Sequence, residues 1–351
     1  MQKSDKHFWE VDFAMIDVAN AITLLANYII VPSLAYGSQL ALGALGITLV
    51  YAVLRFSNFA HGEMMSFGTM IAILMVWLFQ SIGISIAPLP TALIALPFSI
   101  ITTIFLLLIL DKFVFRYYQS QRVQPVTFMI VSVGVMFFLA GFIRFIIGTS
   151  KKNFADGERF IIKASEFKQM TGLAEGLSIR TTQAITVIAT LILVTAIFWF
   201  LNKTRMGKSM RAFSDNEDLA LLSGIKPERV IIVTWMLVGA LAAVAGTLYG
   251  LDKGYKPFVY LQLVLPIFAA AIVGGVGNPI GAVIGGYVIA FSEAFITFAY
   301  KRFLTYLLPD EWAPDGLVQL LSTEYKFAVS FVLLVIVLLV RPTGLFRGKT
   351  L

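Results

Sequence analysis

Two polar interruptions divide long apolar runs, one in each half of the chain: segments 58–63 (Asn-Phe-Ala-His-Gly-Glu) and 274–279 (Gly-Gly-Val-Gly-Asn-Pro). Inside a membrane, a broken helix exposes backbone N–H and C=O groups that can bind polar solutes where lipid is excluded. The pair therefore favours a translocation pathway. For any single glycine the alternative is close helix packing, as Gly-x-x-x-Gly spacings from Gly246 and Gly277 indicate. The candidate pathway residues are Asn58, His61, Glu63, Gly274, Gly275, Gly277, Asn278 and Pro279.

Few ionisable side chains lie within the apolar runs. Glu293 lies in the middle of one run, where a carboxylate is costly and is usually paired or functional. Arg144 lies near the end of another run and is the candidate partner, unless its side chain extends to the membrane surface. We expect a structural Glu293–Arg144 pair in preference to a substrate contact. His61 and Glu63 are too few for a metal site, because the chain has only one other histidine, His7.

Segment 204–229 is the most densely charged stretch between apolar runs. Asp215 and Asn216 can cap a helix, apolar residues then follow at a spacing of three, and Gly224 supplies an end. This pattern predicts a short amphipathic helix outside the lipid, which would offer a docking surface to a soluble partner. The alternative is a solvated loop that only joins two spans.

The composition is that of an integral membrane protein. Of the 351 residues, 58% are hydrophobic and 13% are charged, and the mean hydropathy is +0.85. Soluble domains are about half apolar and a quarter charged. The net charge of +7 lies in loops beside spans, where anionic lipid explains it and nucleic acid does not. The absence of cysteine excludes disulfides and thiolate chemistry.

Nine apolar runs are candidates to cross a bilayer, and several of them reach the roughly 20 residues that a span requires. A tenth run, 13–33, contains Asp17, Asn20 and Asn27, and is an N-terminal extension or an extra helix within residues 1–33. The sequence thus predicts an all-α polytopic bundle of nine or ten transmembrane helices. The nine runs are 34–54, 64–82, 91–110, 126–147, 182–201, 230–251, 261–276, 280–300 and 326–340.

Strict alternation of the spans places the short loop 111–125, segment 204–229 and the C-terminus on one side. Because 111–125 and the tail have an excess of Lys and Arg, this side is predicted to be cytoplasmic. The loops 149–181 and 301–325 are then extracytoplasmic. The sequence contains no Walker motif, Ser-His-Asp set or His-Glu-x-x-His motif, so we expect a transport protein and not an enzyme. Its energy must come from a partner or an ion gradient.

Several passages together resemble permease subunits of bacterial branched-chain amino acid ABC importers, the LivH-like group. The most specific is Asn-Phe-Ala-His-Gly-Glu, which ends the longer match 46–63. The matches cover most of residues 34–346 in the family's order. The supporting passages are 204–212, 221–225, 239–250, 269–286 and 322–326 running into 341–344.

The resemblance implies a single permease domain of the ABC importer type over residues 1–351, in the inner membrane of a bacterium. It implies a second related permease, two ATP-binding subunits and an extracytoplasmic solute-binding protein, with lipid around the chain and no nucleic acid. No cofactor is expected on this chain, because the partner subunits would bind ATP. The solute would be a branched-chain amino acid, or a related amino acid, amide or urea.

Segment 218–224 is similar to the importer coupling loop, whose pattern is Glu-Ala-Ala, three residues, Gly. Asp replaces Glu and Leu replaces the first Ala. The rival hypothesis is a stand-alone ion-coupled secondary transporter of a small polar solute, for which Glu293 and Arg144 are the clear ion-coupling candidates. The residues that the resemblance assigns to ATPase coupling are Arg211, Asp215, Asp218, Ala220 and Gly224.

Overall fold

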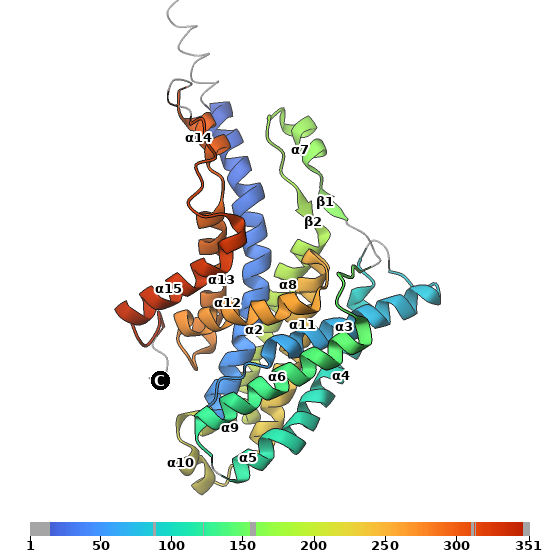
Figure 1. The fold of residues 1–351 in the computed structure, drawn as a ribbon, viewed down its shortest axis with the longest axis vertical. Helices are drawn as coiled ribbons and strands as arrows, with labels where there is room; N and C mark the ends of the chain where they lie inside the picture. The colour runs from blue at the N-terminus through green and yellow to red at the C-terminus, as the bar shows by residue number, and fades with distance from the viewer. Residues whose placement is uncertain are drawn as a thin grey trace, which may run out of the picture.

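The computed structural model describes residues 15–86, 89–121, 123–154, 159–309, 312 and 314–346. This part of the chain contains nine helices that are long and apolar enough to cross a membrane (Figure 1). The predicted all-α polytopic class is confirmed. The helices are Met15–Leu54, which includes η1 (Ala26–Ile30) and α2 (Val31–Leu54); α3 (His61–Ser81); α4 (Ala92–Leu110), continued by η2 (Asp111–Phe115) and α5 (Arg116–Ser120); α6 (Pro125–Ile147); α8 (Thr181–Lys203); α11 (Pro227–Lys253); α12 (Pro257–Gly274); α13 (Pro279–Thr297); and η4 (Thr323–Tyr325) with α15 (Lys326–Val340).

The first helix is continuous from Met15 to Leu54, over 40 residues. At 1.5 Å per residue it is about 60 Å long, twice the ~30 Å of a hydrocarbon core. The expectation that 13–33 could form an extra span is therefore wrong for residues 15–33, which extend α2 at its N-terminal end. Residues 13 and 14 lie outside the described part.

The polar residues that interrupt this first run bind a neighbouring loop. The side-chain oxygen of Asn20 accepts a hydrogen bond from the backbone N–H of Glu175 at 3.1 Å, and that of Asn27 accepts one from Ser178 N–H at 2.9 Å. The Glu175 carboxylate in turn lies 2.9 Å from Arg302 Nε. The helix extension is thus braced by two segments that are distant in sequence.

The remaining elements gather at the two ends of the bundle. In Figure 1 the short helices α5, α9 and α10 lie at one end, and α7, α14 and the two strands lie at the other. The elements outside the spans are β1 (Phe160–Ile162), α7 (Ala164–Thr171), β2 (Ile179–Arg180), α9 (Arg205–Asp215), α10 (Glu217–Leu222) and α14 (Lys301–Leu307). This separation agrees with the sidedness that strict alternation predicts. The strands pair antiparallel, Phe160 opposite Arg180, in a segment that the sequence predicted only as a loop.

α2 is the central helix. Every residue from 37 to 50 is buried, and α2 packs against α8, α11, α12 and α13. The outer helices expose apolar side chains instead: Phe105 on α4 is 65% exposed and Phe145 on α6 is 89% exposed. Because lipid is as apolar as these side chains, such exposure is expected on the membrane-facing surface. Polar side chains that are buried inside the bundle are therefore the better indicators of a functional site.

Candidate functional site

The predicted coupling segment folds into two short helices at one end of the bundle. α9 begins at an N-cap, Thr204, whose hydroxyl oxygen accepts a hydrogen bond from Gly207 N–H at 3.0 Å. Its apolar face buries Met210 and Phe213 against the bundle. α10 begins at Asn216, whose side chain accepts a hydrogen bond from Leu219 N–H at 3.0 Å. The predicted capping by Asn216 is confirmed, although the segment contains two helices and not one.

α10 presents apolar side chains outward. Leu219 is 61% exposed and Leu222 is 85% exposed, whereas Ala220 is buried. Gly224 follows with φ of +80° and open space around its α-carbon, which ends the helix as predicted. Exposed leucines on a short helix at an end of the bundle, next to the charged residues Glu217 and Asp218, form an apolar patch of the kind that marks interaction sites.

An arginine just before the first interruption is absent from the predicted site residues. α2 ends at Arg55, which has φ of +59°, a left-handed conformation that is uncommon outside glycine. Its guanidinium Nη2 donates a hydrogen bond to the backbone carbonyl of Ser214 at 2.9 Å. That carbonyl lies in the last turn of α9, where backbone acceptors lack helical partners and cations are favoured. Arg55 therefore joins the end of the central helix to the coupling segment.

The rest of the first interruption is buried. The Asn58 side chain accepts a hydrogen bond from Ala60 N–H at 3.1 Å and so closes a local turn. The His61 ring packs against Gly46, where an added Cβ would lie 2.6 Å from Cε1. Glu63 is fully buried, and neither of its carboxylate oxygens has a hydrogen-bond partner among the described residues. The candidate pathway residues at 58–63 thus lie inside the bundle.

The predicted Glu293–Arg144 pair is wrong. In the described structure Arg144 lies over the ring of Phe258, 5.8 Å from its centroid, and its electrostatic partner is Glu63. Glu293 instead accepts a hydrogen bond from Ser330. The sequence pattern favours this pair because both residues are charged and lie within apolar runs, but the pattern does not reveal which helices are neighbours.

A tyrosine lies beside the Glu63 region, in the link between α11 and α12. Tyr255 and Ser66 are joined by a hydrogen bond of 3.1 Å between their hydroxyl oxygens. Burial raises the pKa of the Tyr255 hydroxyl above its ordinary value, so this group keeps its proton at neutral pH. It therefore contributes a neutral hydrogen-bonding group next to the buried carboxylate.

The second interruption is a tight turn between α12 and α13. The Asn278 side chain caps α13 by accepting hydrogen bonds from Ile280 N–H at 3.0 Å and Gly281 N–H at 3.1 Å. Gly274 packs so closely against Gly281 that an added Cβ would lie 2.0 Å from the Gly281 carbonyl oxygen. At Gly274 the structure therefore shows close helix packing, which is the alternative to a role in the pathway.

This close approach predicts a large loss of stability for Gly274→Ala. Overpacking in a core costs about 1 to 3 kcal/mol, and here the obstacle is backbone, which cannot move aside as a side chain can. We expect the purified variant to unfold at a clearly lower temperature in detergent. The matched control is Gly141→Ala on α6, because nothing lies within 4 Å of a Cβ added there. Equal unfolding temperatures for the two variants would contradict the packing account.

The second interruption lies beside the predicted coupling residues. A cavity of about 240 Å³ is lined by Gly277, Asn278 and Pro279 and also by Arg211 and Asp215 of α9. Arg211 is held in place by a 3.0 Å hydrogen bond from Nη1 to the side-chain oxygen of Asn202. The structure therefore brings part of the predicted pathway against part of the predicted coupling segment.

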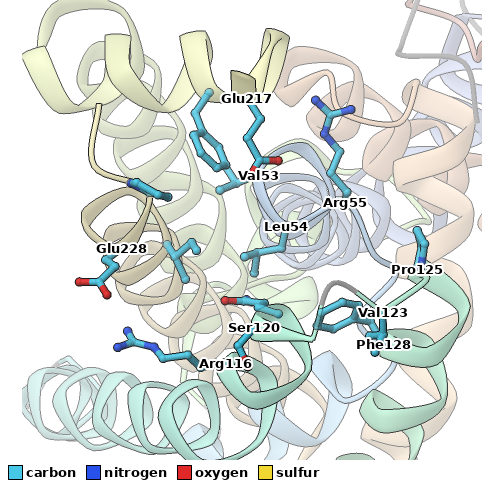
Figure 2. Close-up of a pocket in the computed structure, with 14 residues that line it drawn as sticks. Val53, Leu54, Arg55, Arg116, Ser120, Val123, Pro125, Phe128, Glu217 and Glu228 are labelled. Carbon is cyan, nitrogen blue, oxygen red and sulfur yellow. The ribbon is translucent and has the colours of Figure 1, made fainter. Parts of the chain in front are cut away.

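A larger cavity of about 450 Å³ lies at the same end (Figure 2). Figure 2 shows charged side chains from separate elements around it: Arg55 after α2, Arg116 on α5, Glu217 on α10 and Glu228 on α11. The cavity thus lies between the end of the central helix and the coupling helices. Asn58, His61 and Glu63 of the first interruption line neither of these two cavities.

Comparisons with known proteins agree with the family resemblance of the sequence motifs. The family model described as the branched-chain amino acid transport system / permease component matches residues 29–338. The high-affinity branched-chain amino acid transport system permease protein LivH of Salmonella typhimurium is 32% identical over 314 residues, which are 88% of this chain and 91% of the relative. The permease protein BraD of Pseudomonas aeruginosa is 28% identical over 326 residues, 90% of this chain and 94% of the relative. A probable LivH of Methanocaldococcus jannaschii is 28% identical over 315 residues, 89% of this chain and 90% of the relative.

Proposed function

Because this chain belongs to the branched-chain amino acid transport system / permease component family, we propose that it forms part of the membrane channel of an ABC importer. It is a multi-pass membrane protein and a transport subunit, not an enzyme. The solute that it moves into the cytoplasm is a branched-chain amino acid, as the names of its relatives describe for them. Those relatives are permease components of transport systems, which favours this function over a stand-alone ion-coupled carrier.

The partners in this proposal are a second, related permease, two ATP-binding subunits and an extracytoplasmic solute-binding protein, assembled in the bacterial inner membrane. ATP binds to the partner subunits and no cofactor binds to this chain. The translocation pathway runs between the two permeases and is lined in part by segments 58–63 and 274–279. The coupling residues are Arg211, Asp215, Asp218, Ala220 and Gly224.

The outward-facing leucines of α10 are the observation that carries this proposal. Leu219 and Leu222 are exposed at the end of the bundle that has the short Lys- and Arg-rich loop 111–125. An ATP-binding subunit that covers them can move α9 and α10 when it closes on ATP. Arg55 joins this movement to the central helix through its hydrogen bond with Ser214. This movement switches the permease between an outward-facing and an inward-facing state only if α10 contacts the ATPase differently in the two states.

Co-purification from the native host tests the proposal. The tagged chain is extracted in a mild detergent, and the proteins that elute with it are identified by mass spectrometry. We expect two copies of a P-loop ATPase, or one each of two such subunits, and a second permease. A chain that elutes alone and transports solute after reconstitution without ATP would refute the proposal in favour of an ion-coupled carrier.

A further inference from the structure

A small cavity whose lining includes charged and hydroxyl side chains lies at the other end of the bundle, where α11 and α13 end and α2 and α15 begin. Its volume is about 120 Å³. An engineered cavity of ~150 Å³ holds a benzene molecule, so this space is sufficient for a small polar group. The side chains around it come from four helices. Its polar and charged side chains include Ser33 and Tyr36 of α2, Glu293 of α13, and Lys326 at the start of α15.

The Glu293 carboxylate is only half satisfied. It is 3% exposed, and Oε1 accepts a hydrogen bond from Ser330, whereas Oε2 is buried without a hydrogen-bond partner among the described residues. The Ser33 hydroxyl on the same cavity is 1% exposed and likewise has no partner there. The Tyr36 hydroxyl lies close to the carboxylate. Buried polar atoms without partners are costly, and a polar group that binds in this cavity from outside the chain would satisfy them.

A cation lies across the same cavity. Lys326 Nζ lies 5.3 Å from the centroid of the Tyr36 ring and interacts electrostatically with Glu293. Within the described part of the chain, Lys326 and Glu293 do not come close enough to form an ion pair. The second cation at the cavity, Lys253, already pairs with Asp252 at 3.2 Å. One carboxylate and one ammonium group thus face a shared space without touching.

We propose that this cavity binds the α-ammonium and α-carboxylate groups of a zwitterionic amino acid during transport. Glu293 Oε2 accepts hydrogen bonds from the ammonium, with Ser33 and Tyr36 beside it, and Lys326 donates to the carboxylate. A zwitterion satisfies both charges at once, whereas an uncharged amide or urea satisfies neither. The inference rests on the proposed importer function and deepens it, because it assigns the side chains of this chain that bind the two charged groups of the solute.

The first test is transport by the complete importer in proteoliposomes, with the solute-binding protein outside and ATP inside. Leucine uptake and ATP hydrolysis are measured for Glu293→Gln, Lys326→Met and the matched control Glu324→Gln. Glu324 is an exposed carboxylate two residues from Lys326. Because charge-assisted hydrogen bonds are lost, we expect uptake per ATP to fall at least about ten-fold in the first two variants and to stay unchanged in the control.

The second test locates the bound solute and does not depend on the variants being active. A leucine analogue with a diazirine in its side chain is irradiated in the wild-type complex, and labelled peptides are identified by mass spectrometry. We expect labelling of peptides that contain 32–36 and 290–297, blocked by excess leucine and reduced at least ten-fold in Glu293→Gln. Labelling elsewhere only, or equal labelling in Glu293→Gln, would overturn the inference.

Different results would refute the zwitterion site and the importer function. An importer that takes up urea or an amide with ATP, but no amino acid, overturns the zwitterion site and leaves the importer assignment standing. A reconstituted chain that needs no ATP for uptake overturns the importer assignment itself.

Discussion

The double substitution Leu219→Asp and Leu222→Asp is expected to weaken binding of the ATP-binding subunit by at least about 30-fold. Both side chains are exposed in the described chain, at 61% and 85%. If the partner covers them, each is an apolar anchor whose loss costs about 1 kcal/mol, so the pair accounts for about 30-fold, and a buried aspartate adds a desolvation penalty. Both positions lie on the outer surface of α10, so the permease itself should keep its unfolding temperature. Binding is measured by titrating the purified ATPase onto the permease in nanodiscs.

The matched control for this prediction is Leu307→Asp on α14. Leu307 is 46% exposed and belongs to α14, which lies at the opposite end of the bundle from α10 (Figure 1). It should bind the ATPase as the wild type does. Unchanged ATPase binding by the double variant, or equal losses in the double variant and the control, would show that α10 is not the docking surface.

Arg55→Gly is expected to reduce uptake per ATP hydrolysed at least about ten-fold while preserving the fold. Glycine adopts the left-handed conformation of this position without strain, so the backbone turn after α2 is retained. The substitution removes the hydrogen bond to Ser214, a contact of a charged donor that is worth about 1.5 to 3 kcal/mol. Uptake and ATP hydrolysis are measured in the same proteoliposomes, and unfolding temperature in detergent.

Two further variants separate the roles of the side chain and the backbone at this position. Arg55→Ala removes the same hydrogen bond and adds strain at φ of +59°, so it should be less stable than Arg55→Gly by about 1 kcal/mol, with equal loss of coupling. Lys208→Ala removes one exposed cation from α9 without touching Ser214, and it should transport normally. Normal transport by Arg55→Gly would mean that the arginine only shapes the turn.

The positions of the spans could be predicted from the sequence because bilayer thickness dictates the length of each apolar run. The cap of α10 could also be predicted, since Asn216 acts on an N–H group only three positions away. The N-cap Thr204 of α9 acts over the same distance but was not predicted. These are local relations. They hold whatever the neighbouring helices are.

Relations between distant segments could not be predicted in the same way. Asn20 and Asn27 lower the hydropathy of the first run, yet they bind Glu175 and Ser178 and the helix continues through them. Glu293 was matched with Arg144, although its neighbours come from α2 and α15. A single sequence does not reveal which helices pack together, so it cannot assign such partners.

Arg55, whose backbone is left-handed, is a further residue whose role could not be predicted from the sequence. No residue pattern distinguishes Arg55 from an ordinary cation at the end of a span, because its conformation is imposed by the turn and by the Ser214 carbonyl. The residue that joins the central helix to the coupling segment was therefore absent from the predicted site. Only the arrangement of α2 against α9 identifies it.

The most direct test of the importer function is uptake of labelled leucine by proteoliposomes that contain this chain, its second permease and its ATP-binding subunits. The solute-binding protein is added outside, and ATP is enclosed inside. The account predicts uptake that requires ATP, persists when ion gradients are collapsed, and is lost when Leu219 and Leu222 are replaced by aspartate. Leucine uptake that continues without ATP and stops when an ion gradient is collapsed would contradict it.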